Sequence, residues 1–185
     1  NKIFVERTAN VGVLPLPVAI NYGCSGPVLR GSGLRWDLRK VDGYSVYPEL
    51  AFNVPIGEGL VGTVGDCWDR NYVRVQECWE SLGLIEQCVE KLLGEHCRTS
   101  DFDPQAVVPK KIRPQAMDFY VRAENPKGEL GFYLISDGSP NPYRYRVRPP
   151  SFINLTILED MCLGHHVADV VIILGSIDIV LGEVD

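Results

Sequence analysis

A single carboxylate near the end of the chain is the side chain best placed to do chemistry. Asp178 interrupts the apolar stretch that begins at Ala168 and closes at Asp185. Burial of a lone carboxylate is costly unless the group is paired, hydrated or used. One interpretation is a helix cap or a buried, hydrogen-bonded strut. The other is a carboxylate with a shifted pKa that lines a cavity, where it relays protons or organises water.

Arginines alternate with apolar or aromatic residues over 143–148. Because side chains in a strand alternate between the two faces, the three guanidinium groups fall on one face. That face is either solvent-exposed and partly neutralised by Glu124 or Glu129, or it docks an acidic partner or lines a site. The residues concerned are Arg144, Arg146 and Arg148, with Tyr143, Tyr145 and Val147 on the opposite face.

The glycine-containing segment 30–40 resembles a phosphate-binding loop only superficially. It lacks the GxxxxGK[ST] spacing and follows no recognisable strand. An ion pair between Asp37 and either Arg35 or Arg39 is the better explanation of its charges. We therefore expect a structural loop here.

Histidines and cysteines form no metal motif. His165 and His166 are adjacent, so on a helix they point about 100° apart and favour capping or surface roles. The six cysteines contain no CxxC pair, which argues against a zinc ribbon or a disulfide framework and favours a reducing compartment. No metal site is predicted.

Composition limits the class of protein. With 185 residues and 45% hydrophobic content, the chain is expected to be globular. Its net charge of -6 makes it poorly suited to bind nucleic acid through phosphate contacts. The apolar stretch 170–174 is far shorter than the roughly 20 residues of a membrane span. Any membrane role is therefore expected to be peripheral.

The elements that must position these residues follow from periodicity and turn signals. Glycine and proline break every period over 10–65, so residues 1–65 are expected to be loop-rich. Residues 66–93 are predicted to form a long helix, because apolar positions recur every three or four residues. Asp66 is its expected N-cap and Gly94 its expected stop.

The remainder of the chain predicts a small sheet followed by helices. Residues 94–116 are polar and interpreted as a linker. Three alternating stretches, 117–124, 129–136 and 143–148, are separated by two turn signals and predict an antiparallel meander within 117–150. Residues 151–185 are expected to hold a helix over 154–174, broken at Gly164, and an irregular tail. The fold class is α+β.

Several long motifs identify a family resemblance. The stretches NYGCSGPVLRGSGLRWDLRK (21–40), GDCWDRNYVRV (65–75), ENPKGELGFYLISDGSPNPYRYRVRPPSF (124–152) and HHVADVVIILGSIDIVLGEVD (165–185) closely resemble the C-terminal half of the 49 kDa subunit of respiratory complex I. The matches are collinear and cover nearly the whole chain. The stretch 148–158 is also similar to the corresponding subunit of the plastid NAD(P)H dehydrogenase-like complex.

The resemblance implies the C-terminal part of a nickel-iron-hydrogenase large-subunit-like fold. In that relative an Asp-Pro-Cys-x-x-Cys signature holds the metal. The two thiolate positions correspond here to Val180 and Glu183, so soft sulfur ligands are missing and nickel is not expected. The same pocket is implied to form part of a quinone cavity, with Asp178, Val180 and Arg148 as the candidate residues.

The resemblance also implies partners and a reaction. It implies a core peripheral-arm piece of NADH:ubiquinone oxidoreductase, inactive alone, that binds no cofactor itself. Ubiquinone would enter a shared cavity near a 4Fe-4S cluster held by an iron-sulfur subunit. Other peripheral-arm subunits and a membrane-arm subunit at the quinone entrance are further expected partners. The expected location is the matrix side of the mitochondrial inner membrane.

Two features of the family have no counterpart in this sequence. The His and Tyr that contact the quinone headgroup belong to the family's N-terminal half, so we expect that half as a separate chain of a split subunit. No catalytic residue is therefore assigned in this piece. The alternatives are a scaffold piece without quinone contact, the plastid-type subunit, and a free-standing binding domain.

Overall fold

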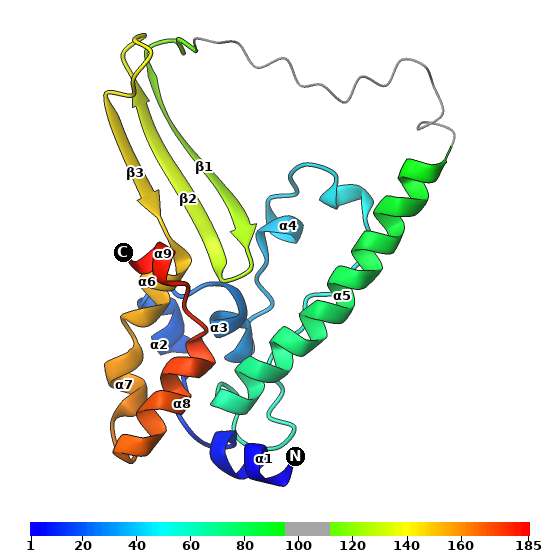
Figure 1. Cartoon of the computed structure of the whole chain (residues 1–185), viewed down its shortest axis with the longest axis vertical. Helices are drawn as coiled ribbons and strands as arrows, with labels where there is room; N and C mark the ends of the chain where they lie inside the picture. Colours follow the sequence, from blue (N-terminus) through cyan, green and yellow to red (C-terminus); the bar gives the residue numbers. More distant parts are fainter. Residues whose placement is uncertain (95–111) are drawn as a thin grey trace.

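The computed structural model describes residues 1–94 and 112–185 (Figure 1). Within these residues helices combine with one antiparallel sheet, which confirms the α+β class. The elements in chain order are α1 (Lys2–Thr8), α2 (Leu16–Asn21), α3 (Gly26–Gly31), α4 (Leu38–Val41), the 3-10 helix η1 (Tyr47–Glu49), α5 (Cys67–Leu93), β1 (Met117–Asn125), β2 (Gly128–Ser136), β3 (Arg144–Arg148), α6 (Pro150–Leu155), α7 (Leu158–Cys162), α8 (Val167–Ile177) and α9 (Leu181–Val184).

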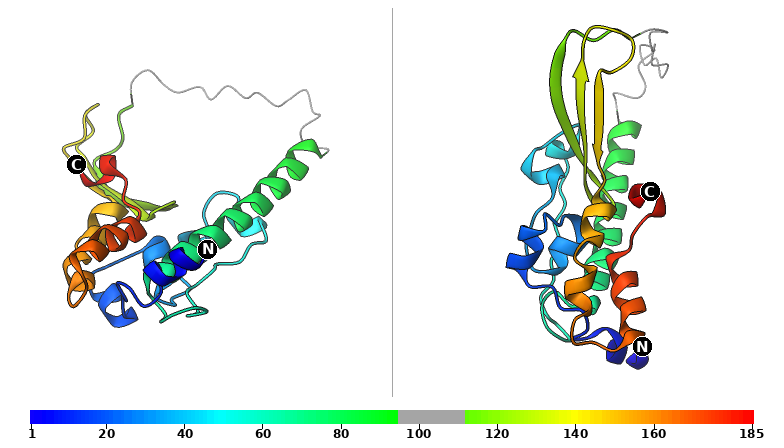
Figure 2. Two further views of the ribbon diagram at one scale, coloured as in Figure 1. Left: turned by 60° about the horizontal axis from the view of Figure 1, so that its bottom comes forward. Right: turned by 90° about the vertical axis from the view of Figure 1, so that its left-hand side faces the viewer.

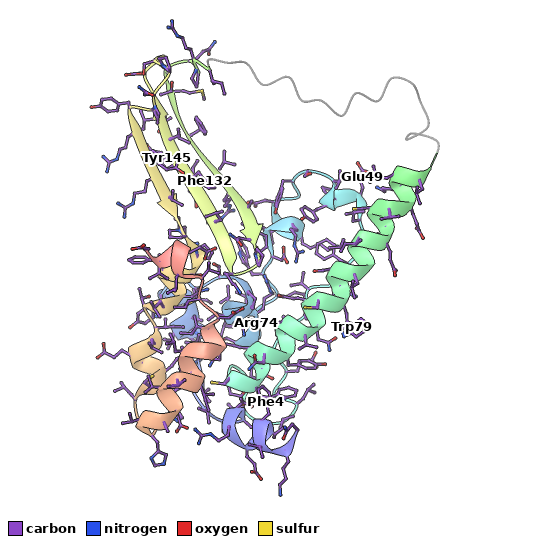
Figure 3. All side chains as sticks on the ribbon, in the orientation of Figure 1. Phe4, Glu49, Arg74, Trp79, Phe132 and Tyr145 are labelled. Atoms are coloured by element: carbon purple, nitrogen blue, oxygen red, sulfur yellow. The ribbon has the colours of Figure 1, made fainter. Side chains whose placement is uncertain are left out.

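Helix α5 confirms the predicted long helix. The Asp66 carboxylate caps it by accepting a hydrogen bond from the Asp69 N–H, and Gly94 ends it by donating to the Glu90 carbonyl. Its first half packs against α3 and α8. Its outer face, including Trp79, is exposed (Figure 3). Most of the predicted linker, residues 95–111, lies outside the described residues.

The predicted meander is also confirmed. Strands β1, β2 and β3 pair antiparallel in that order, with Asn125 opposite Gly128 across a tight turn that contains Pro126 and Lys127. Phe132 and Tyr145 stack on one face of the sheet, with ring centroids 6.2 Å apart (Figure 3). The turn at 125–128 points toward α5, which makes it relevant to the site.

The predicted helical region over 154–174, with its break at Gly164, is confirmed, and the structure adds a second break at 156–157. Three helices occupy this region, and the first begins at Pro150, where proline suits the first turn. Thr156 ends it by donating its hydroxyl to the Ile153 carbonyl, and the buried Ile157 fixes the corner. The predicted break at Gly164, with φ of +81°, is present. The tail is also not wholly irregular, because it contains α9.

Two hydrophobic clusters hold the described elements together. The larger joins the N-terminal segments to α5, α7 and α8 through buried residues that include Leu14, Val28, Cys67 and Ile173. The smaller surrounds Phe52 and joins the 50–54 segment to α5. The sheet and the second half of α5 extend in different directions from this helical base (Figures 1 and 2). No helix in residues 1–94 or 112–185 is long and apolar enough to span a bilayer.

Candidate functional site

Asp178 lines an open cleft of about 600 Å³. The cleft lies between α5, the β1–β2 turn and the end of α8, and α3 and the 39–47 region complete it. Elements far apart in sequence therefore meet around one carboxylate that the sequence had singled out. The remaining features of the site follow from what each element contributes.

The α5 side of the cleft is charged at Arg74 and Glu77 and becomes more apolar farther along the helix. Cys78, Leu82 and Ile85 line it from successive turns of the helix, together with Ser81. The spacing of these residues places them on one helix face. Their exposure in the described structure, 51% for Leu82 and 58% for Ile85, leaves this wall open to a ligand or to another polypeptide.

Asp178 caps α8 and faces the cleft at the same time. Its backbone has φ of 60° and ψ of 55°, the left-handed conformation that aspartate adopts more readily than most residues. Its Oδ2 atom accepts a hydrogen bond from Lys127 Nζ and lies 3.3 Å from Arg74 Nε. Among the described residues no donor contacts Oδ1. With 41% of its side chain exposed, Asp178 is not the fully buried strut of the first interpretation.

Arg74 joins α5 to the end of α8. Its NH2 group donates to the carbonyls of Ser176 (2.6 Å) and Ile177 (3.0 Å). Burial lowers the pKa of the Arg74 guanidinium, and the charge of Asp178 partly opposes that effect. Figure 3 shows Arg74 between the lower part of α5 and the end of α8.

The floor of the cleft is a buried charge network centred on Arg30. Its Nε atom donates to Glu77 at 2.6 Å, and its NH1 group donates to Glu124 at 2.7 Å. Burial raises the pKa of the Glu124 carboxyl, and the nearby Arg30 guanidinium opposes this shift. The predicted ion pair of the 30–40 segment is confirmed between Asp37 and Arg39, at 2.6 Å.

The β1–β2 turn is fixed from behind by two other elements. Asn154 of α6 donates to the carbonyls of Lys127 and Ser25, each at 3.2 Å. A Cβ atom on Gly26, where φ is +67°, would lie 2.3 Å from the Lys127 carbonyl oxygen. The turn therefore needs glycine at 26, and it presents the Lys127 side chain to Asp178 from a fixed backbone.

Val180 and Glu183 occupy different surroundings from Asp178. Val180 is 42% exposed and does not line the cleft formed by the described residues. Glu183 accepts hydrogen bonds from Asn125, at 3.0 Å, and from the hydroxyl and the N–H of Ser151. With an apolar side chain at one position and an already bonded carboxylate at the other, these residues do not fit a thiolate-held nickel ion.

Arg148 lies apart from Asp178 as well. Its guanidinium donates to the carbonyls of Glu129 and Gly23, both at 2.8 Å, and it does not line the cleft. Arg144 and Arg146 are exposed, as the solvent-exposed interpretation of this face expects, but within the described residues neither the Glu124 nor the Glu129 carboxylate forms an ion pair with an arginine of β3. The Glu124 carboxylate pairs with Arg30, and that of Glu129 pairs with Arg122 at 3.4 Å, because these cations lie closer across the sheet and the core.

The histidines have the structural roles that were predicted. His166 is the N-cap of α8, in a reciprocal capping arrangement with Asp169. Its neighbour His165 accepts a hydrogen bond from the Gly12 N–H at 3.2 Å.

Sequence reasoning missed Lys127, Arg74 and the Arg30 network. Lys127 lies in a turn signal that was used only to separate two strands. Arg74 occupies the same side of the long helix as the apolar wall residue Cys78, four positions later. This four-residue spacing was the only sequence signal that could have placed Arg74 beside the apolar wall. Its contacts with α8 join residues about 100 positions apart, which no local pattern predicts.

Comparison with known proteins places this site in a family. The model of the respiratory-chain NADH dehydrogenase 49 Kd subunit family matches residues 1–185. An NADH-quinone oxidoreductase subunit of Cytophaga hutchinsonii is 66% identical over 186 residues, which cover 100% of this chain and 47% of the relative. The corresponding NADH-quinone oxidoreductase subunits of Amoebophilus asiaticus and Chlorobium luteolum are 58% and 55% identical, and each is covered to 46%.

The chain therefore spans about half the length of the curated relatives that it matches. The similarity nevertheless extends over all 185 residues, including the α8 end, the β1–β2 turn and the first half of α5 that surround Asp178. The chain belongs to the family of the respiratory-chain NADH dehydrogenase 49 kDa subunit.

Proposed function

We propose that this chain forms part of the quinone-reduction cavity of a multisubunit NADH:quinone oxidoreductase. The observation that carries the proposal is the position of Asp178, with one carboxylate oxygen free among the described residues, at the charged end of a cleft with an apolar wall. A quinone is likewise divided into a polar and an apolar part, because its ring carries two polar oxygens and its tail is apolar. Small-molecule sites commonly combine apolar walls with a few placed polar groups.

The charges around Asp178 suit the reaction. Two cations, Lys127 and Arg74, flank one carboxylate, so this end of the cleft carries a local positive excess. Such an excess stabilises negative charge that develops on a quinone oxygen during reduction. A quinone ring has no proton to give, so Asp178 Oδ1, which has no donor among the described residues, can carry a proton to a quinone oxygen and accept a hydrogen bond from the hydroxyl that forms there. We assign it a polar, proton-linked role, while the electrons come from a 4Fe-4S cluster in another subunit.

For Val180 and Arg148 we also propose the roles that the family resemblance implies. Val180 follows Asp178 by two residues and would form an apolar wall of the complete cavity once other polypeptide covers the tail. Arg148, anchored to Gly23 and Glu129, would belong to a charged network leading away from it. We further propose that the fold is the C-terminal part of a nickel-iron-hydrogenase large-subunit-like fold.

The proposed partners complete what this stretch lacks. They are the N-terminal half of the family's chain, on this polypeptide or a separate one, the iron-sulfur subunit with the terminal cluster, other peripheral-arm subunits, and a membrane-arm subunit at the quinone entrance. The named relatives are bacterial NADH-quinone oxidoreductase subunits, which favours this type over the plastid one. We propose that the chain belongs to a peripheral arm at the surface of an energy-coupling membrane. Its location at the mitochondrial inner membrane stays a prediction.

Substitution of Asp178 by Asn tests the proposal. Asparagine is nearly isosteric and also tolerates the left-handed backbone conformation, so the α8 cap is retained while the charge is lost. In the assembled enzyme we expect NADH oxidation with a quinone acceptor to fall about tenfold or more, while oxidation with ferricyanide is unchanged. A scaffold without quinone contact predicts equal rates in the variant and the wild type with both acceptors.

Val180→Met gives an independent measurement. If Val180 forms a wall of the cavity, the larger side chain changes the concentration of a quinone-site inhibitor needed for half inhibition, while assembly stays normal. Unchanged inhibition in assembled enzyme places Val180 outside the cavity.

A further inference from the structure

Arg74 makes three contacts with the last turn of α8 and the residue that follows it. Its NH2 group donates to the Ser176 and Ile177 carbonyls, and its Nε atom lies 3.3 Å from Asp178 Oδ2. Its side chain is only 19% exposed. One guanidinium of α5 thus fixes both the end of α8 and the carboxylate that follows.

The end of a helix needs such a partner. The last four carbonyls of a helix have no intrahelical donor, and glycine usually occupies the left-handed position that follows them. Here the left-handed residue is Asp178, with φ of 60°, instead of glycine. Charge-assisted hydrogen bonds from a buried guanidinium to two of these carbonyls offset the cost of that conformation.

We propose that Arg74 is a positioning residue for Asp178, and this inference rests on the proposed function. Arg74 holds the backbone at 176–177 by hydrogen bonds and forms an ion pair, without a hydrogen bond, with Asp178 Oδ2, which accepts its hydrogen bond from Lys127. The Oδ1 atom is then the one that remains for the ligand. Arg74 lines the cleft, and beyond the positive charge that it adds there, it acts on the ligand through Asp178.

Arg70, one turn earlier on α5, shows what a purely structural arginine does in this fold. It is fully buried and donates to the Ser176 hydroxyl and to the carbonyls of Gly65 and Gly12. It therefore ties loops and the Ser176 side chain to the core, and its hydrogen bonds within the described residues do not reach Asp178. Arg74 instead contacts the Ser176 and Ile177 backbone carbonyls and Asp178 itself, which distinguishes the two roles.

A double-variant cycle in the assembled enzyme separates positioning from a structural role. The variants are Arg74→Met, Asp178→Asn and the two combined, and the rate with quinone is divided by the rate with ferricyanide. We expect Arg74→Met to lower this ratio about tenfold, mainly through kcat, because a misplaced group loses its orientation toward the ligand. In the Asp178→Asn background we expect less than about a twofold further loss, because two residues that act through one interaction are not additive.

Two further variants complete the test. Arg74→Lys keeps the charge and is expected to restore part of the ratio, whereas Arg146→Met, on the exposed strand β3, is expected to leave it unchanged. If Arg74→Met does not assemble, the cycle is measured with Arg74→Lys, with the same expected lack of additivity.

The outcomes are distinguishable. Losses that multiply in the combined variant would show that Arg74 acts independently of Asp178, which overturns the inference. A loss in Asp178→Asn with no loss in either Arg74 variant also overturns it and leaves the proposed function standing. No loss in Asp178→Asn refutes the proposed function, and the inference falls with it.

Discussion

The Ser151 hydroxyl donates a hydrogen bond to the Glu183 carboxylate and accepts one from the Val180 N–H at 3.2 Å. Ser151 lies in α6 and Glu183 in α9, so a single buried serine holds the chain's last helix against the body of the protein. The Glu183 carboxylate therefore anchors the tail to α6.

Ser151→Ala is expected to loosen the tail. Loss of hydrogen bonds to a charged group costs about 1–3 kcal/mol, which corresponds to roughly tenfold or faster amide exchange when the tail opens locally. Hydrogen exchange of residues 179–185 in the assembled enzyme measures this. Thr156→Ala, which removes an exposed hydroxyl at the end of the same helix, is the matched control. Equal tail exchange in both variants would contradict the anchoring role.

Gly26→Ala is expected to displace the β1–β2 turn. The added Cβ would lie 2.3 Å from the Lys127 carbonyl oxygen, and the positive φ at Gly26 adds backbone strain of about 1–2 kcal/mol. We therefore expect a lower midpoint of thermal unfolding and a lower rate with quinone, because Lys127 moves away from Asp178.

Gly83→Ala is the matched control for that substitution. Gly83 lies within α5 and has no neighbouring atom within 4 Å of an added Cβ among the described residues. Because alanine is the better helix former, we expect this variant to be more stable by about 0.5–1 kcal/mol. If both variants unfold at the wild-type temperature, the close approach at Gly26 does not limit the stability of the protein.

Glu124→Gln is expected to change how stability depends on pH. Burial raises the pKa of Glu124 above its usual value of 4.5, so the folded protein holds this proton more tightly than the unfolded chain does. The resulting stabilisation is fully present below the unfolded pKa and is lost as the pH rises through the folded pKa. The stability of the wild type relative to Glu124→Gln should therefore fall with rising pH across that window.

Thermal unfolding of both proteins between about pH 4 and pH 8 measures this difference. Carboxylates outside the Arg30 network are the same in the two proteins, so the comparison isolates Glu124 and the groups coupled to it. A difference in midpoint that stays constant over the whole range would show that Arg30 offsets the burial completely.

Local sequence patterns were enough to predict the elements that depend on neighbouring residues. The caps at Asp66 and Gly94 and the apolar spacing between them defined α5, and two turn signals between alternating stretches defined the sheet. The singular carboxylate Asp178 was also visible, because a charged residue in an apolar stretch stands out without any knowledge of the fold. Family motifs covering the whole chain supplied the expected function.

Only the tertiary structure decided what surrounds Asp178. Its partners Lys127 and Arg74 lie 51 and 104 residues away, and no local pattern encodes which cation reaches which carboxylate. The same reason explains the additional break in the helical region 154–174, where Ile157 is buried at a corner, and the pairing of Glu124 and Glu129 with cations other than the arginines of β3. Local propensity sets helices and turns, whereas long-range packing and charge pairing are decided by the chain as a whole.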